Sequence, residues 1–273
     1  MVFSLRVVAV WSVAWLSLVL PPGAFAQDVF AFESSVPALA EPWHFDAPSG
    51  VAVSDGGLVF VADTGRDRIR VFGASGMLVA QWGGEGPLAG EFQSPSAVAW
   101  SRAGLDAPSR VYVADTGNNR VQVFDPDGEF RGQWGSAGQG QGQFDSPRGI
   151  AVDNTGRVYV ADTGNDRIQV FDSDGNFVRA WGTSGNGDEM LDRPAGISVR
   201  DADNAIFVAD SGNNRIQQFS PDGVLVRSNF GAVTGPAYNG PMSVSAGAAG
   251  EIFVGDTGND RVVALSAEGV LIA

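Results

Sequence analysis

One phrase recurs five times along the chain in nearly the same form: VADTGRDR from Val61, VADTGNNR from Val113, VADTGNDR from Val160, VADSGNNR from Val208 and VGDTGNDR from Val254. The aspartates of successive copies lie 46 to 52 residues apart. A period of this length is typical of a repeat architecture, in which one supersecondary unit is stacked along the chain. The repeat constrains function much less than fold, because residues common to all units first of all hold the units together.

The unit is clearest in the third copy, between Ser146 and Gly182, which holds runs rich in Val, Ile, Phe and Tyr at 149–152, 158–161, 168–171 and 177–181. Short runs bounded by Asp, Asn and Gly are typical of antiparallel strands joined by tight turns. No sustained apolar period of 3.6 residues follows the N-terminal segment, so we expect almost no helix. Four strands per unit predict an all-β fold, a β-propeller whose four-stranded blades bury their faces against their neighbours.

Two recurring apolar positions fit packing between blades. An aromatic residue precedes glycine at the end of the fourth run, and an aromatic residue or leucine lies three residues before the proline that opens each blade. The first set is Trp82, Trp134, Trp181 and Phe230. The second set is Phe45, Phe92, Phe144, Leu191 and Tyr238, ahead of Pro48, Pro95, Pro147, Pro194 and Pro241.

This combination resembles the NHL repeat family of β-propellers. The resemblance rests on P-x-G-[IV]-A-V at Pro48–Val53 and Pro147–Val152, on V-[YF]-V-A-D-[TS]-G-N-[DN]-R-[IV]-Q-x-F, and on a later D-G and aromatic-Gly; it covers residues 46–270. The family includes RNA-binding and ubiquitin-ligase-associated propellers, an amidating lyase, streptogramin-lyase-like enzymes and exported bacterial proteins. The resemblance therefore implies a fold and leaves the function open.

The repeats divide the chain into units at approximately 46–94, 95–146, 147–193, 194–240 and 241–273. Propellers of the resembling family usually have six blades. The run Val29–Phe32 resembles a fourth strand without its blade, and the last unit reaches Ala273 in or just after its own fourth run. The sequence leaves open a five-bladed propeller or an incomplete six-bladed one.

Residues 1–26 read as a secretory signal peptide. Arg6 precedes an apolar run from Val7 to Leu20, and Ala24-Phe25-Ala26 is a pattern that signal peptidase accepts. The alternative is a membrane anchor, but the run is shorter than the roughly 20 residues that span a bilayer. We therefore expect a propeller over 27–273, with no membrane insertion after cleavage. We also expect a secreted or periplasmic location, which is compatible with the absence of cysteine.

The formal net charge of −14 argues against nucleic-acid partners. Such partners are bound largely by neutralising phosphates with a basic face, whereas the arginines here are spread through the repeats. The same acidity argues against docking on an anionic lipid surface.

Each repeated aspartate has an arginine five residues later, and the pairs are Asp63 with Arg68, Asp115 with Arg120, Asp162 with Arg167, Asp210 with Arg215, and Asp256 with Arg261. Five equivalent carboxylates could form a metal ring. We favour a structural role, in which the aspartate accepts hydrogen bonds from the N–H groups of its own turn and pairs with the arginine.

Few residues suit catalysis. His44 is the only histidine, and cysteine is absent, so the histidine-rich zinc site of the amidating lyase cannot be built. His44 is more simply explained by aromatic packing. The turns Asp125–Gly128 and Asp172–Gly175 resemble the start of a calcium loop but lack its downstream glutamate, which favours hairpin turns. The stretch Gly138–Gln143 is no phosphate loop and is expected to be a flexible connection.

The remaining candidates lie in the variable connections between blades, which share a face with the DTGN turns. The candidate binding face is Trp43, His44, Glu91, Asp145, Arg148, Asp188, Asp192, Arg193 and Tyr238. The sequence favours an exported, non-enzymatic propeller that binds a protein, peptide or glycan and needs no cofactor. The alternatives are a calcium-dependent enzyme of the lyase or lactonase type, since calcium needs only oxygen ligands, and a purely structural module.

Overall fold

The computed structural model describes residues 44–102, 108–231 and 237–272. It divides into two units, and the architecture below belongs to the unit Phe45–Ile272. The predicted signal peptide, the run Val29–Phe32 and Trp43 lie outside the described residues. Within them, no helix is long and apolar enough to cross a membrane.

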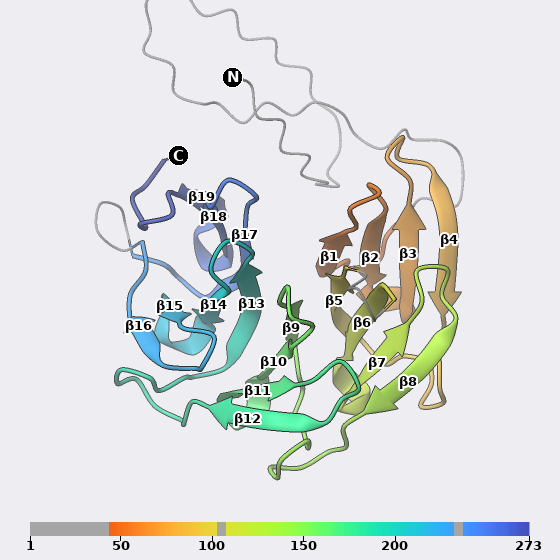
Figure 1. Cartoon of the computed structure of the whole chain (residues 1–273), viewed down its shortest axis with the longest axis horizontal. Coiled ribbons are helices and arrows are strands. Elements are labelled where there is room, and N and C mark those ends of the chain that lie inside the picture. The colour runs from red at the N-terminus through yellow and green to blue at the C-terminus, as the bar shows by residue number, and fades with distance from the viewer. Residues whose placement is uncertain (1–43, 103–107, 232–236, 273) are drawn as a thin grey trace, which may run out of the picture. The chain divides into compact units, whose positions relative to one another are not determined.

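The protein is all-β, with five antiparallel sheets that follow one another along the chain as blades (Figure 1). The first strands are β1 (Gly50–Val53), β5 (Pro95–Ser101), β9 (Gly149–Val152), β13 (Pro194–Arg200) and β17 (Pro241–Ala246). The second strands are β2 (Val59–Asp63), β6 (Arg110–Asp115), β10 (Val158–Asp162), β14 (Ala205–Asp210) and β18 (Ile252–Asp256). The third strands are β3 (Arg68–Phe72), β7 (Arg120–Phe124), β11 (Arg167–Phe171), β15 (Arg215–Phe219) and β19 (Arg261–Leu265).

In the described residues, four blades have a fourth strand and the fifth has three strands. The fourth strands are β4 (Leu78–Gly83), β8 (Phe130–Trp134), β12 (Phe177–Trp181) and β16 (Leu225–Arg227). In the described residues the fifth sheet contains only β17, β18 and β19. The expected four strands per repeat are thus found in four repeats of five.

Among the residues that the structure describes, helical structure is limited to one 3-10 turn in each blade, as the absence of a helical apolar period predicts. These turns are η1 (Thr64–Arg66), η2 (Thr116–Asn118), η3 (Thr163–Asn165), η4 (Ser211–Asn213) and η5 (Thr257–Asn259). Each lies between the second and third strands, within the recurring phrase.

The first strands of successive blades lie next to one another: β1 by β5, β5 by β9, β9 by β13, and β13 by β17. This arrangement is a β-propeller with the proline-led strands innermost. Pro95, Pro194 and Pro241 are themselves the first residues of their strands. Proline suits a strand start because its missing N–H leaves no gap in the ladder there.

The core lies between the blades. The cluster between the second and third blades joins Tyr112 and Phe144 to Ile150, Val158 and Phe171. Equivalent residues form the other three clusters, and burying this apolar surface is the main stabilising term. The fourth-strand tryptophans complete the seams, since Trp134 packs 5.6 Å from Phe171 of the next blade between ring centroids.

Candidate functional site

The recurring phrase forms a sharp turn from the second strand into the third. In the third blade the chain passes through Thr163-Gly164-Asn165 and reaches Asp166 with φ of +53°. The equivalent residues of the other blades, Asp67, Asn119, Asn214 and Asp260, are also left-handed. Aspartate and asparagine tolerate this conformation better than other side chains, which explains why the position alternates between them.

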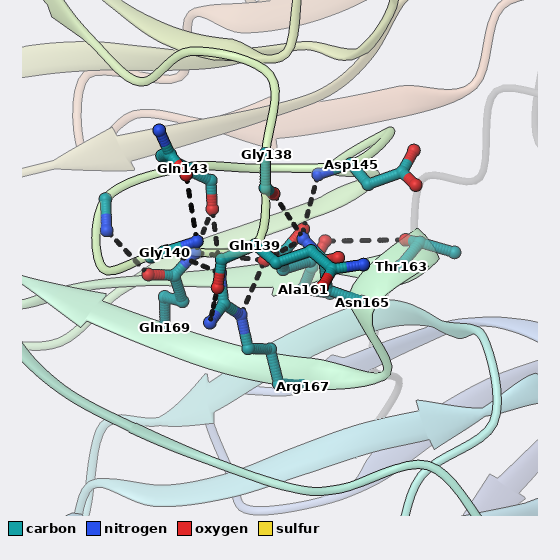
Figure 2. A network of polar contacts seen from close by, with 12 residues as sticks. Gly138, Gln139, Gly140, Gln143, Asp145, Ala161, Thr163, Asn165, Arg167 and Gln169 are labelled. Atoms are coloured by element: carbon teal, nitrogen blue, oxygen red, sulfur yellow. Dashed lines mark hydrogen bonds and ion pairs between the residues drawn. The ribbon is translucent and has the colours of Figure 1, made fainter.

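The carboxylate that opens this turn is the centre of a polar network (Figure 2). Asp162 is completely buried. One oxygen, Oδ1, accepts hydrogen bonds from the Asp145 backbone N–H at 2.8 Å and from Asn165 Nδ2 at 3.0 Å. Oδ2 accepts from Arg167 Nε at 2.7 Å and from Gln169 Nε2 at 3.0 Å. A buried charge is stable only when it is paired and hydrogen-bonded in this way.

The backbone donor differs from the sequence expectation. Asp162 does not cap its own 3-10 turn, and neither do its four equivalents. The backbone N–H comes instead from the connection that precedes the blade, as from Asp145 to Asp162 and from Gln93 to Asp115 at 2.8 Å. The carboxylate therefore fastens the inter-blade connection to the turn.

Arg167 binds the same inter-blade connection at several carbonyl groups. Its guanidinium donates to the carbonyl oxygens of Gln139 at 2.8 Å, Gly140 at 2.7 Å and Gln143 at 2.9 Å. Gln169 donates to the Gln143 carbonyl at 2.6 Å. The expectation of a flexible connection at Gly138–Gln143 is therefore wrong: its carbonyl groups are held by the blade that follows (Figure 2).

The same network recurs in blades two and four. Arg120 Nη2 donates to the carbonyls of Leu88 and Glu91, and Arg215 Nη2 to those of Gly187 and Met190. At the position of Gln169, blade one has Arg70, whose guanidinium lies 5.0 Å from the centre of the Phe45 ring. Blade five has Val263 there, so its network lacks the glutamine donor.

In blade five the carboxylate keeps its remaining donors. Burial by itself would raise the pKa of Asp256, but hydrogen bonds from the Asn239 backbone, Asn259 and Arg261 outweigh it and hold the pKa below its ordinary value. The Arg261 Nε to Asp256 Oδ2 distance is 2.7 Å. This carboxylate is therefore ionised over the whole neutral range.

A second repeated contact joins adjacent blades directly. Thr163 Oγ1 donates to the carbonyl of Pro194 in the next blade at 2.7 Å. Thr64, Thr116 and Ser211 make the same bond to Pro95, Pro147 and Pro241. The hydroxyl of the recurring phrase therefore links each of the first four blades to the proline that opens the next one.

Close packing explains the glycine of the phrase. A Cβ atom on Gly164 would lie 2.4 Å from Cγ of Asp145, too close for any side chain. Asp145 thus lies directly over the turn. The equivalent residues Gln93 and Asp192 lie over Gly117 and Gly212 in the same manner. The connections and the DTGN turns therefore share one face, as the alternation of strands predicts.

The structure places the described candidate binding residues in exposed, half-buried and buried positions. His44, Asp145, Arg148, Asp188 and Arg193 are exposed. Asp192 is half-buried and pairs with Arg193, with 3.1 Å between Oδ1 and Nε, and the half-buried Glu91 accepts a hydrogen bond from the Leu88 N–H at 3.1 Å.

The prediction that Tyr238 belongs to the binding face is wrong. Its side chain is buried in the cluster between blades four and five, and burial raises its pKa to about 12. It occupies the position of Phe92, Phe144 and Leu191, all completely buried. An aromatic residue at this repeated position is a packing residue, as its spacing before Pro241 already indicates.

Sequence reasoning missed several members of the network. Gln122, Gln169 and Gln217, and Asn118, Asn165 and Asn213, all donate to the central carboxylates. The sequence pattern that could have identified them is their fixed spacing, with asparagine three residues and glutamine seven residues after each aspartate. The described residues contain no group of three or more His, Asp or Glu side chains placed to hold a metal ion.

The fold and this face define the class of protein: an all-β propeller with blades fastened by a repeated Asp–Arg network. The NHL repeat model matches residues 45–72, 144–171 and 191–219, so the chain contains NHL repeats in these three places. It is 35% identical over 97 residues to human NHL repeat-containing protein 3, which covers 34% of this chain and 26% of that protein. The chain spans about a quarter or less of the curated relatives it matches.

Solved structures show the same fold at low sequence identity. A virginiamycin B lyase from Staphylococcus aureus matches with a TM-score of 0.59 and 19% identity, over 82% of this chain and 68% of that one. A gluconolactonase from Xanthomonas campestris matches with a TM-score of 0.60 and 16% identity, over 83% of this chain and 75% of that one. At these identities the likeness concerns the fold alone.

Proposed function

We propose that the protein is an exported, non-enzymatic binding module that presents the connections and DTGN turns, here called the loop face, to a protein, peptide or glycan. The proposal rests on one observation, that repeated and variable polar residues have different surroundings. The repeated ones, such as Asp162, Asn165 and Arg167, form hydrogen bonds within and between blades. The variable ones, such as Asp145, Arg148 and Asp188, are exposed on a scaffold that holds them in place.

An enzymatic role has weaker support. The five repeated carboxylates have no exposed surface, and each pairs with its arginine at 2.7 or 2.8 Å, so they are poorly placed to bind substrate or calcium. The likeness to a lyase and a lactonase is a likeness of fold. Calcium binding that raises the melting temperature would instead support a calcium-dependent enzyme.

Export rests on residues 1–26, outside the described part of the chain. Expression with the full leader in a Gram-negative bacterium, followed by N-terminal sequencing of the periplasmic product, tests it. We expect a mature chain that begins at Gln27. An uncleaved chain in the cytoplasm would contradict the export part of the proposal.

Binding is tested by probing peptide and glycan arrays with the purified chain and measuring the strongest hit by calorimetry. We expect the variant Asp145→Ala/Arg148→Ala to bind that hit at least about tenfold more weakly, because central polar anchors carry most interface energy. The matched control is Glu129→Ala/Asp174→Ala, two exposed residues at the third-to-fourth strand hairpins of the opposite face. We expect this control to bind like the original chain.

Two results would overturn the proposal. Equal losses in both variants would show that the loop face has no special role. A rise of several degrees in melting temperature at micromolar calcium, without any array hit, would favour the calcium-dependent enzyme, since a ligand that binds only the folded state stabilises it.

A further inference from the structure

A hollow of about 460 Å³ lies between blades four and five. It opens on the side of the hairpins that join the first strand to the second and the third to the fourth, here called the hairpin face, which is opposite the loop face. Blade four contributes Arg200, Gln218, Val226 and Arg227, and blade five contributes Ala249 and Ala267. Small-molecule sites in proteins have volumes of roughly 300–1,000 Å³, so the hollow has room for a small ligand.

Smaller side chains at two packing positions explain the hollow. In the preceding seam, the ring of Trp181 packs 5.7 Å from that of Phe219 between centroids, and the indole also lies over Gly223 of the next hairpin. In the last seam, Phe230 takes the position of the tryptophan, and Leu265 takes that of the phenylalanine. The smaller pair fills less of the seam beside the hairpin of blade five.

Gln218 is the one polar residue at its position in the repeat. On the third strands of blades one to three this position is a valine packed in a seam cluster, and in blade five it is Ala264; the valines are Val71, Val123 and Val170. Gln218 is only 8% exposed, and its side-chain amide makes no hydrogen bond among the described residues. Buried polar groups are nearly always hydrogen-bonded in folded proteins. An unpaired buried amide that lines a hollow therefore indicates a polar ligand atom.

Arg227 places a cation beside this amide. It lies directly opposite Gln218 in the pairing of β15 with β16, and its guanidinium lies 5.3 Å from the centre of the Phe230 ring. The Nη1 group donates to the Glu268 carbonyl of blade five. A guanidinium has five N–H donors in a fixed plane, so the exposed Arg227 retains donors for a second acceptor.

The other lining groups narrow the class of ligand. Arg200 is already engaged, since its Nε and Nη2 donate to Asp203 at 3.0 and 2.7 Å and its Nη1 donates to a backbone carbonyl of blade five at 3.1 Å. Much of the remaining wall is apolar and comes from Ala202, Val226 and Ala249. A carboxylate accepts hydrogen bonds from guanidinium and amide groups, and an apolar body suits such walls.

We propose that this hollow binds a small organic acid, with its carboxylate on Arg227 and Gln218 Nε2 and its apolar body against the alanine and valine walls. A single carboxylate fits better than a phosphate or a dicarboxylate, because Asp203 and Glu268 line the same hollow and the net charge of the chain is −14. The hollow lies on the hairpin face, so this inference does not depend on the proposed function of the loop face.

The test titrates 3-phenylpropionate into the full chain labelled with nitrogen-15. Nuclear magnetic resonance follows the side-chain amide signals of Gln218 and the Nε signal of Arg227. We expect saturable shifts of both signals. We also expect at least about tenfold weaker binding of 3-phenylpropionamide, which has the same shape without the charge, because hydrogen bonds to an ionised acceptor are the stronger ones.

Gln218→Val is the decisive variant. It restores the residue of blades one to three, so it should fold at least as well as the original chain, and we expect it to bind the acid at least about tenfold more weakly. Arg227→Gln should weaken binding to a similar extent. The matched controls are Gln141→Val, an exposed residue of the loop face, and Arg179→Gln, which lies opposite Val170 in blade three. We expect both controls to bind like the original chain.

Three results would overturn the proposal. The first is the absence of saturable shifts at Gln218. The second is equal binding of the acid and its amide, which would show that Arg227 recognises no charge. The third is an equal loss in Arg179→Gln and Arg227→Gln, which would show general attraction of an anion to arginine. If Gln218→Val failed to fold, the comparison of these two arginine variants would decide alone.

Discussion

The seams between neighbouring blades and the two outer ends of the blade series contain the same residues at equivalent positions, yet their environments differ completely. Val98, Ile150, Ile197 and Val244 on the first strands are 5 to 7% exposed, whereas Val51 in blade one is 61% exposed. On the third strands Val121 has no exposed surface, whereas Val262 in blade five is 59% exposed. The difference shows that burial in this protein is decided by the neighbouring blade, and that the repeat sequence alone does not decide it.

Hydrogen bonds of equivalent hydroxyl groups also differ between the seams and the last blade. Thr163, inside the series, donates its hydroxyl hydrogen bond to Pro194 of the next blade at 2.7 Å. Thr257, in the last blade, is exposed, and its hydroxyl lies 3.5 Å from the Gly255 carbonyl of its own blade. A seam thus adds hydrogen bonds as well as apolar burial, so each seam residue should contribute more to stability than its equivalent at an end of the series.

The largest expected difference concerns the central carboxylates. Asp162→Ala should lower the free energy of unfolding by about 3 kcal/mol, because it leaves a half-buried arginine, two side-chain amides and a backbone N–H without their acceptor. Asp256→Ala should cost less, since its network lacks the glutamine donor and Arg261 is more exposed than Arg167. Urea unfolding of both variants measures the difference. Equal losses would show that the end blade is as tightly coupled as an internal one.

Truncation of an apolar side chain should also lower stability more in a seam than at an end of the blade series. Val121→Ala should destabilise the protein by roughly 2 kcal/mol through lost burial and a residual cavity, whereas Val262→Ala at the equivalent exposed position should change stability by less than about 0.5 kcal/mol. The substitution is identical, so the pair isolates the effect of the neighbouring blade. A large loss in Val262→Ala would mean that this face is covered in solution.

The inter-blade hydroxyl bond should have a smaller effect. Thr163→Val keeps the shape of the side chain and removes the donor, so it should cost about 1 kcal/mol. Thr257→Val should be neutral within the error of the measurement, because its hydroxyl makes no bond to another blade in the described residues. Differential scanning calorimetry of the two variants provides the comparison, and a neutral Thr163→Val would remove this bond from the account of the seam.

Tyrosine ionisation should have the smallest effect on folding stability near neutral pH. All three tyrosines lie in seams. Burial is the main cause that raises the pKa of Tyr112, Tyr159 and Tyr238 to about 12 each. Because these values exceed the unfolded pKa of about 10, their contribution to stability is full below pH 10 and is lost as the pH rises toward 12. Absorbance at 295 nm should therefore show tyrosinate only together with unfolding. Ionisation at pH 10 in a folded chain would place a tyrosine in solvent.

Much of the fold follows from the sequence. The five units, the order of short strands, the turns and the near absence of helix all follow from the spacing of the recurring phrase and from strand periodicity. The proline-led strands are innermost, as the motif implies. The sequence did not predict that the fifth sheet has three strands in the described residues, because the run Val270–Ile272 has the composition of a strand whether or not it is paired.

The candidate site was predicted less completely. The sequence showed that each aspartate has an arginine five residues later, and a turn between them brings the two together. It did not show that Asp162 accepts the Asp145 N–H, because that bond joins residues brought together by inter-blade packing. Tyr238 was placed on the surface for the same reason, since a connection residue is buried only where two blades close around it.

The sequence by itself determined what each repeat can form: strands from alternating β-branched residues, turns from Asp, Asn and Gly, and a local pairing of Asp with Arg. The tertiary structure alone decided which of these equivalent residues are buried and which hydroxyls bond to a neighbouring blade. The physical reason is that strand and turn preferences act within a few residues, whereas burial and inter-blade hydrogen bonds depend on a surface supplied by another blade some fifty residues away.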